Sequence, residues 1–173
     1  MSLLEIPDQL KNAVAQQLQL NPQLSTLELA TQFQQPEGKI ILALPTELVS
    51  IRDGKYAYEI LQQLPNWGVV VTILEKEGSI FEIKQPFPFG KNGYGYYNLN
   101  LGSNTESGLH GHLKLENIAK VALISKPFKG KESYAFVFIS QAGTVIFKIY
   151  LGRDEHRQLL PEQVNKFKQL LTQ

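Results

Sequence analysis

Hydrophobic residues at helical spacing mark the start of the chain. Leu10, Val14 and Leu18 recur every four residues, which predicts a helix with one apolar side. Ser25 and Glu28 follow, at the spacing of a capping box in which the serine caps a helix and the glutamate is its third residue. The pattern therefore predicts two short helices within the first third of the sequence.

The next segment is less regular, but it is still mainly helical in pattern. Residues 39–44 form a short apolar run that fits a helix or a strand. Another helix is expected to begin at Asp53 or Gly54 and to end before Pro65. Residues 1–66 are thus predicted to form the mainly helical part of the protein.

From Trp67 the pattern changes to that of strands, because β-branched and aromatic residues become dense and alternation with period two appears. Phe81 and Ile83, for example, alternate with the polar Glu82 and Lys84. We predict an antiparallel sheet of roughly seven short strands between Trp67 and Gly152. The segments are WGVVVTILE, SIFEIK, YGYYNLNL, LHGHLKL, KVALISKPF, SYAFVFIS and TVIFKIYLG.

The last part of the chain, residues 153–173, is assigned to a C-terminal helix. Pro161 suits its first turn. Helices, then strands, then one helix predict an α+β fold with a large antiparallel sheet, in one domain that spans residues 1–173. One apolar stripe is expected to face the core, made by Val164, Phe167, Leu170 and Leu171.

Composition removes several classes of function. The chain has 173 residues, and its 17 Lys and Arg nearly balance 16 Asp and Glu, which argues against a nucleic-acid partner. Residues 25–35 contain no Lys or Arg, so a basic recognition helix is not expected there. The absence of cysteine excludes disulfides and thiolate chemistry. Without a recognisable signal peptide or a long apolar run, we expect a cytoplasmic protein with no membrane partner.

Two of the three histidines, His110 and His112, lie one residue apart, so in an extended strand they point to the same face. Imidazole binds zinc, copper, nickel and haem iron. The pair could equally be two polar residues on an exposed strand face. A divalent-metal site that uses both histidines, with Glu116 nearby, is a further alternative.

Other residues could complete a binding site. Tyr94, Tyr96 and Tyr97 cluster just before the histidine strand. Arg153 and Arg157 flank His156 in a charged segment that could be a solvated helix entry or a clamp for carboxylates. Aromatic side chains, imidazoles and cations together suit a flat apolar ligand with acidic groups, and haem is such a ligand. Signatures of a nucleophile, of a metalloprotease and of a P-loop are absent.

The residues from about Leu44 to Leu171 resemble the haem-utilisation cytosolic carrier family of the HutX/ChuX type. The run from Phe147 to Val164 is the most specific part of this resemblance. The motifs that carry it are Trp67-Gly68, YGYYNL from Tyr94, GHLK from Gly111, FKGKES from Phe128 and FKIYLGRDEHRQLLPEQV from Phe147.

The resemblance implies a helical part and a large antiparallel sheet that forms a homodimer with stacked sheets. It implies haem binding in the cytoplasm and delivery of haem to a haem-processing enzyme. The family's haem-ligand histidine falls on His112, whereas Glu75 and Tyr94 stand where relatives often have histidine. The iron could therefore be bound by His112 alone, by His112 with His110, or by His112 with Tyr94.

These expectations combine into one model of binding. Haem lies against the sheet face that carries His112, and Tyr94 and Tyr96 form a wall. Lys114, Arg153 or Arg157 holds a propionate. Haem is then cargo and the protein is not an enzyme. The alternative on the same fold is a haem-degrading or iron-releasing enzyme.

Overall fold

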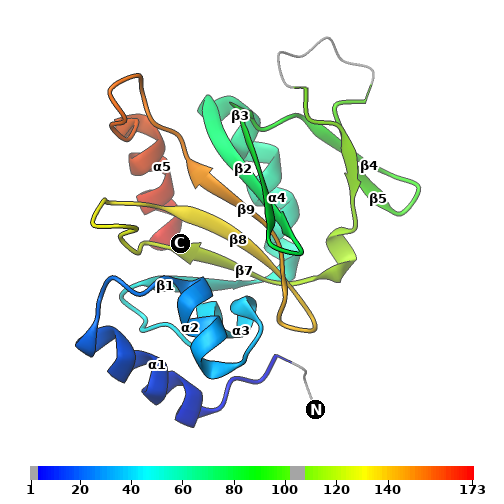
Figure 1. Ribbon diagram of the computed structural model, residues 1–173. Helices are drawn as coiled ribbons and strands as arrows, with labels where there is room; N and C mark the ends of the chain where they lie inside the picture. The colour runs from blue at the N-terminus through cyan, green and yellow to red at the C-terminus, as the bar shows by residue number, and fades with distance from the viewer. Residues whose placement is uncertain (1–3, 102–107) are drawn as a thin grey trace.

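An antiparallel sheet of six strands runs through the centre of the structure, in the order β1-β7-β8-β9-β2-β3 (Figure 1). The computed structural model describes residues 4–101 and 108–173. All neighbouring strands are antiparallel, with one register shift in the β7–β8 pair and one in the β8–β9 pair. Along each strand, alternate side chains face opposite sides of the sheet. The strands are β1 (Val49–Asp53), β2 (Val69–Lys76), β3 (Ser79–Pro86), β7 (Ile118–Ile124), β8 (Ala135–Ser140) and β9 (Val145–Leu151).

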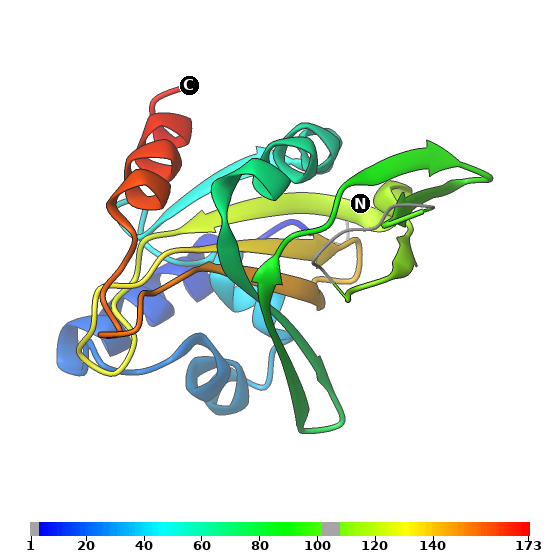
Figure 2. The same cartoon turned by 90° about the horizontal axis from the view of Figure 1, so that it is seen from above.

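Helices cover both faces of this sheet (Figure 2). On one face lie α4 (Ala57–Gln63) and α5 (Pro161–Leu171), and on the other lie α1 (Asp8–Leu20), α2 (Thr26–Phe33) and α3 (Glu37–Leu42). Short 3₁₀ turns span Gly54–Tyr56, Leu64–Trp67 and Leu115–Asn117. The sheet is therefore the middle layer of three.

Each face of the sheet has its own hydrophobic core, and the central strand β8 contributes to both. Phe136 and Phe138 belong to the core under α4 and α5, and Val137 and Ile139 belong to the core under α1–α3. All four are fully buried. Burial on both sides explains why this segment is almost continuously apolar instead of alternating.

A second, smaller sheet lies at one end of the molecule, where it consists of β4 (Gly90–Gly93), β5 (Tyr96–Leu99) and β6 (Gly111–Leu113) (Figure 1). Tyr97 and Leu99 turn inward and join the core under α4 and α5. The Tyr97 ring lies so close to Gly90 that a Cβ there would come within 2.2 Å of it. Glycine at this position therefore lets β4 approach β5.

Several sequence expectations are confirmed by the structure. The α+β architecture is as predicted, and the first two helices and the last one form where the apolar spacing indicated. The capping box is present, because the Ser25 hydroxyl accepts from the Glu28 amide at 3.1 Å while the Glu28 carboxylate accepts from the Ser25 amide at 2.7 Å. The apolar run at residues 39–44 lies largely in α3.

Other expectations need correction. The segment predicted to be mainly helical contains strand β1, which pairs with β7, a partner about 70 residues away along the chain. Residues 90–93, which lie outside the seven predicted strand segments, form β4, so there are two sheets instead of one. The C-terminal helix begins at Pro161, and residues 153–160 precede it as a non-helical connection. For β1 and β4 the pairing partner, not local periodicity, decides the conformation.

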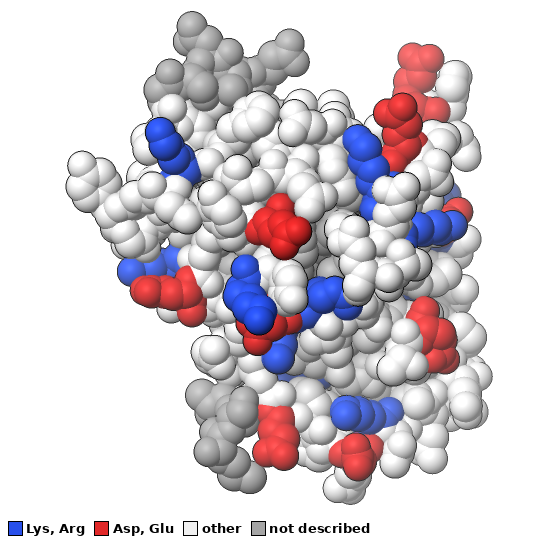
Figure 3. Space-filling model, turned by 180° about the vertical axis from the view of Figure 1, so that it is seen from behind, with Lys and Arg blue, Asp and Glu red and all other residues white. Residues whose placement is uncertain are grey.

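Charged side chains are mixed in sign over the face that carries α4 and α5, where Lys and Arg alternate with Asp and Glu (Figure 3). This distribution agrees with the balanced charge of the sequence. Within residues 4–101 and 108–173, the helices are all too short or too polar to cross a membrane.

Candidate functional site

The small sheet carries the two neighbouring histidines on its outer face. In the register of β5 and β6, His112 is opposite Asn98 and Gly111 is opposite Leu99. His110 and His112 are exposed, whereas Leu109 and Leu113 pack against the core. The prediction that the histidines share a face is therefore confirmed.

His112 belongs to a compact group of side chains. Its Nδ1 lies 2.6 Å from the Oδ1 of Asn98. Its ring meets the Tyr96 ring edge to face, with 5.8 Å between centroids, and the Lys114 ammonium lies 4.8 Å from the centre of the Tyr96 ring. We call Tyr96, Asn98, His112 and Lys114 the His112 cluster. It presents an imidazole, an aromatic ring and a cation on one open face.

Asn98 is the member of the cluster that sequence reasoning missed. It is only 6% exposed, and its Nδ2 lies 3.1, 3.0 and 3.3 Å from the carbonyl oxygens of Lys91, Gly93 and Tyr96. The side chain thus holds the β4–β5 hairpin from inside. Its signal in the sequence is a polar residue at the same alternation as Tyr96, but only the β5–β6 register reveals that it meets His112.

His110 has a different environment, although it lies on the same face. Its Nε2 lies 3.4 Å from the Nδ2 of Asn100, a buried residue just beyond β5. The Nε2 of His110 is therefore directed at the side-chain amide of Asn100.

Lys114 contacts the Tyr96 ring of the small sheet and the carboxylate of Glu116. Its ammonium donates to the Glu116 carboxylate at 2.9 Å. This hydrogen bond, together with the charge of Glu116, raises the pKa of Lys114. The lysine is therefore a positive charge beside Tyr96 at neutral pH.

The three tyrosines expected to form a wall go to three different places. Tyr96 is in the His112 cluster, Tyr97 is buried, and Tyr94 is fully exposed at the tip of the β4–β5 hairpin. Tyr94 and Gly95 both have positive φ, 54° and 78°, as a two-residue hairpin turn of the primed type requires. The Tyr97 hydroxyl accepts from Gln62 at 2.8 Å, and burial raises the pKa of Tyr97.

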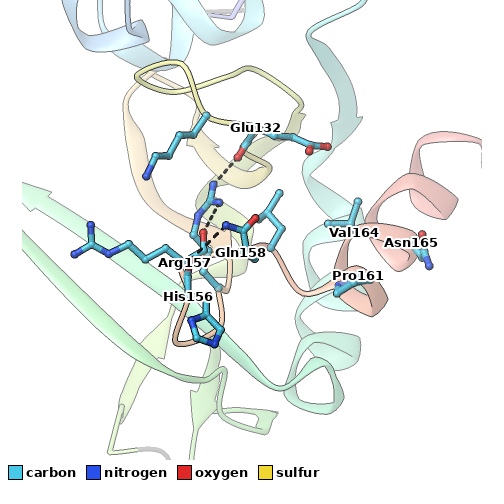
Figure 4. Close-up of a pocket in the computed structure, with 10 residues that line it drawn as sticks. Glu132, His156, Arg157, Gln158, Pro161, Val164 and Asn165 are labelled. Carbon is cyan, nitrogen blue, oxygen red and sulfur yellow. Dashed lines mark hydrogen bonds between the residues drawn. The ribbon is translucent and has the colours of Figure 1, made fainter.

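Arg153 lies far from the histidines, because the β9–α5 connection is at the opposite end of the molecule from the small sheet (Figures 1 and 2). Its guanidinium donates to the carbonyl oxygens of Glu132 and Arg157 (Figure 4). These two hydrogen bonds connect the β7–β8 loop to the β9–α5 connection. Around them is an open cleft of about 550 Å³, which His156, Gln158, Pro161, Val164 and Asn165 also line.

The two remaining positions of interest have structural contacts. His156 is exposed in a turn where the Asp154 carboxylate accepts from the amides of His156 and Gln158, at 2.8 and 2.9 Å, as in an Asx turn. The Glu75 carboxylate accepts from the Gly78 amide at 2.6 Å and stabilises the β2–β3 turn.

A divalent-metal site finds little support in the structure. Within residues 4–101 and 108–173, no three His, Asp or Glu side chains come together as a metal site would need. Glu116 pairs with Lys114 instead of joining the histidines. Among the residues that the structure describes, His110 and His112 have no third ligand of the kind that the divalent-metal interpretation requires.

Comparisons with known proteins give a consistent result. The family model described as haem utilisation ChuX/HutX matches residues 51–170. The intracellular heme transport protein HutX of Vibrio cholerae serotype O1 is 52% identical over 166 residues, which cover 96% of this chain and 84% of HutX.

Solved structures agree with this match. A crystal structure of ChuX superposes with a TM-score of 0.82 at 31% identity, over 92% of this chain and 96% of ChuX. A structure described as the heme binding protein ChuX superposes with a TM-score of 0.81 at 29% identity, over 94% and 97% of the two chains.

Proposed function

Because the chain belongs to the haem-utilisation ChuX/HutX family, we propose that it binds haem as cargo at the His112 cluster and delivers it inside the cell. The carrier role follows from the similarity to an intracellular heme transport protein. The observation that supports this location is the exposed His112 imidazole, held beside Tyr96 and Lys114 on an open sheet face. Haem is cargo, and the protein acts as a binding module instead of an enzyme.

The environment of each candidate ligand favours a single protein bond to iron. The Nε2 of His112 points away from Asn98, whereas the Nε2 of His110 faces Asn100. Tyr94 extends from the hairpin tip into solvent. We therefore expect His112 to be the axial ligand, with Tyr96 against the porphyrin and Lys114 near a propionate. Arg153 is not expected to contact haem bound there, since its donors are used by backbone carbonyls.

An open site with one axial bond suits transfer of haem. Contact between the porphyrin and apolar protein surface supplies affinity in proportion to the area buried, and exposure of the other haem face leaves it accessible to a receiving protein. We expect the recipient to be a haem-processing enzyme that takes haem from this face.

The chain is also expected to form a homodimer through the β2–β3 hairpin, which projects beyond the sheet (Figure 2). Leu74 and Phe81 are directly opposite each other across the two strands, and both are exposed. Strand β3 lies at one edge of the six-stranded sheet. An apolar pair beside an open edge is a surface that a second copy would cover.

Adjacent residues of β3 provide a matched test of the homodimer. Phe81 and Ile80 are 60% and 59% exposed but point to opposite faces of the hairpin. Phe81→Lys should shift the protein toward monomer in sedimentation velocity, whereas Ile80→Lys should leave the distribution nearer to wild type. A wild-type protein that sediments as a monomer at all concentrations would refute the dimer.

Haem titration followed by the Soret band tests the binding site. His112→Ala should lower affinity by about tenfold or more, because it removes the iron–nitrogen bond. His110→Ala and Tyr94→Phe are the controls, and they should stay close to wild type. Unchanged affinity and an unchanged Soret band in His112→Ala would show that iron is bound elsewhere.

The same complex separates a carrier from a haem-degrading enzyme. Under a reductant and oxygen, a carrier returns intact haem, whereas an enzyme yields a ring-opened pigment. Extraction and chromatography of the bound porphyrin after incubation distinguish these outcomes. Catalytic formation of a ring-opened product by the wild-type protein would contradict the carrier function.

A further inference from the structure

We propose that Asn98 is a positioning residue that fixes His112 as the tautomer with the proton on Nδ1 and the lone pair on Nε2. The role of Asn98 toward haem rests on the proposed function, but the tautomer is a property of the haem-free protein. The tautomer of His112 follows from the orientation of the buried Asn98 amide, which determines which nitrogen of the neighbouring ring must carry a proton.

The first step is the orientation of the Asn98 amide. Its Nδ2 faces three carbonyl oxygens, those of Lys91, Gly93 and Tyr96, at 3.0 to 3.3 Å. Carbonyl oxygens only accept hydrogen bonds, so the group that faces them must be the NH₂. The reversed orientation would place the amide oxygen against three other oxygens inside a buried site. The Oδ1 of Asn98 is therefore the atom that faces His112.

The second step is the state of the imidazole. The amide oxygen has no proton to give, so the hydrogen bond of 2.6 Å to His112 requires an N–H at Nδ1. In the neutral ring the other nitrogen, Nε2, then carries the lone pair. Since His112 is exposed, this lone pair is directed outward and can bind iron without first moving a proton.

The third step concerns how strongly the ring binds iron. A hydrogen bond from the far nitrogen fixes the ring orientation and raises its basicity. A neutral amide does this less than a carboxylate would, because it does not draw the Nδ1 proton toward a negative charge. Asn98 thus holds His112 ready for iron while keeping it a neutral ligand, which suits cargo that must later leave.

His110 provides the contrast within the same sheet. Its Nε2 lies 3.4 Å from the Nδ2 of Asn100, which can donate to it. The amide partner of His110 therefore competes for the Nε2 lone pair, whereas the amide partner of His112 leaves that lone pair open. Two histidines two residues apart thus differ because the neighbouring asparagines present opposite ends of their amides.

The direct test is ¹⁵N NMR of the two ring nitrogens in haem-free wild-type protein, in alkaline buffer where histidine is neutral. Long-range ¹H–¹⁵N correlation should assign His112 as the Nδ1–H tautomer. An Nε2–H tautomer would overturn the proposal. This readout needs no haem, so it stands even if the titration of His112→Ala shows that haem binds elsewhere.

A variant then tests the role toward haem. Asn98→Ala should return His112 toward the Nε2–H tautomer, lower haem affinity by about tenfold to a hundredfold, and lower the iron–histidine stretching frequency of the ferrous complex. Asn100→Ala is the matched control and should leave that frequency unchanged. An Asn98→Ala protein that folds, binds haem through His112 and keeps the wild-type frequency would refute the role. If the variant does not fold, the tautomer of His112 in the wild-type protein is the only test of the proposal.

Discussion

Gln163 and Asn98 are buried at opposite ends of the molecule, and their side-chain amides have different roles. Gln163 in α5 donates through Nε2 to the carbonyl oxygens of Trp67 and Val69, at 2.9 and 2.8 Å, and accepts from the Gly152 amide at 2.8 Å. Asn98 also donates to backbone carbonyls, but its oxygen faces a histidine. These three partners of Gln163 are all backbone groups, whereas Asn98 connects the backbone to an exposed ring.

The same difference separates two of the cations that the sequence singled out. Arg153 donates to backbone carbonyls and joins two connections, whereas Lys114 lies over the Tyr96 ring on the open face. A polar residue therefore serves the fold when its partners are backbone groups, and it is available for a ligand when its partners are other side chains at the surface. We expect variants at the two ends to separate stability from haem binding.

The largest expected effect is on stability, at the end of the molecule away from the histidines. Gln163→Leu keeps much of the side-chain volume but leaves buried backbone groups without partners. The free energy of unfolding in urea should fall by about 2–4 kcal/mol. Haem affinity, measured where the variant is still folded, should remain that of wild type. A large loss of haem affinity in a folded variant would contradict the expectation that this end of the molecule contributes to stability and not to haem binding.

A smaller loss of stability is expected at Arg153. Arg153→Met removes the guanidinium while retaining an apolar stem, so the unfolding free energy should fall by about 1–2 kcal/mol. Arg157→Met is the neighbouring control, because there the connection uses the backbone carbonyl and keeps it. Haem titration should be unchanged for both. Weakened haem binding in Arg153→Met alone would instead support a propionate contact.

Alkaline pH should reveal a contribution from the same end. Burial, together with the hydrogen bond and charge of Glu132, raises the pKa of Tyr134 from 10.0 to about 12. Because the folded pKa is above the unfolded one, this contribution is fully present below pH 10 and is lost as the pH rises toward 12. Across that window the unfolding free energy of Tyr134→Phe in urea should therefore fall by about 1–3 kcal/mol less than that of wild type, since one pKa unit corresponds to about 1.4 kcal/mol. Equal losses in both proteins would contradict this.

The smallest effect is expected at the open face. Lys114→Met should weaken haem binding by less than about threefold, because an exposed charge contributes little in water. The difference from wild type should shrink further at high salt. Soret titrations at two ionic strengths measure it, and unfolding curves should coincide with wild type. A salt-independent loss would mean that the bound haem shields Lys114 from solvent.

Particular residues show how far sequence reasoning reached. The spacing of Leu10, Val14 and Leu18 is a local signal, and α1 formed where it indicated. Alternation alone was enough to place His110 and His112 on one face. By contrast, Tyr97 looked like its neighbours in sequence, and only its inward direction from β5 separates it from Tyr96.

Strand pairing explains the remaining differences. Residues 90–93 carry two glycines and little strand propensity, and they became β4 because β5 supplied a partner. Arg153 was a reasonable candidate to hold a carboxylate, but the carbonyls that occupy its donors come partly from a loop 21 residues earlier in the chain. No local pattern contains such a contact.

The sequence by itself determined the class of fold, the shared face of His110 and His112 and, through its motifs, the similarity to haem carriers. These properties depend on residue type and on short, regular spacing, which a linear pattern carries in full. Only the tertiary structure decided which amide faces which histidine, and hence which imidazole keeps its Nε2 free. That choice depends on the register between β5 and β6 and on three carbonyls that fix one amide, and such relations exist only after the chain has folded.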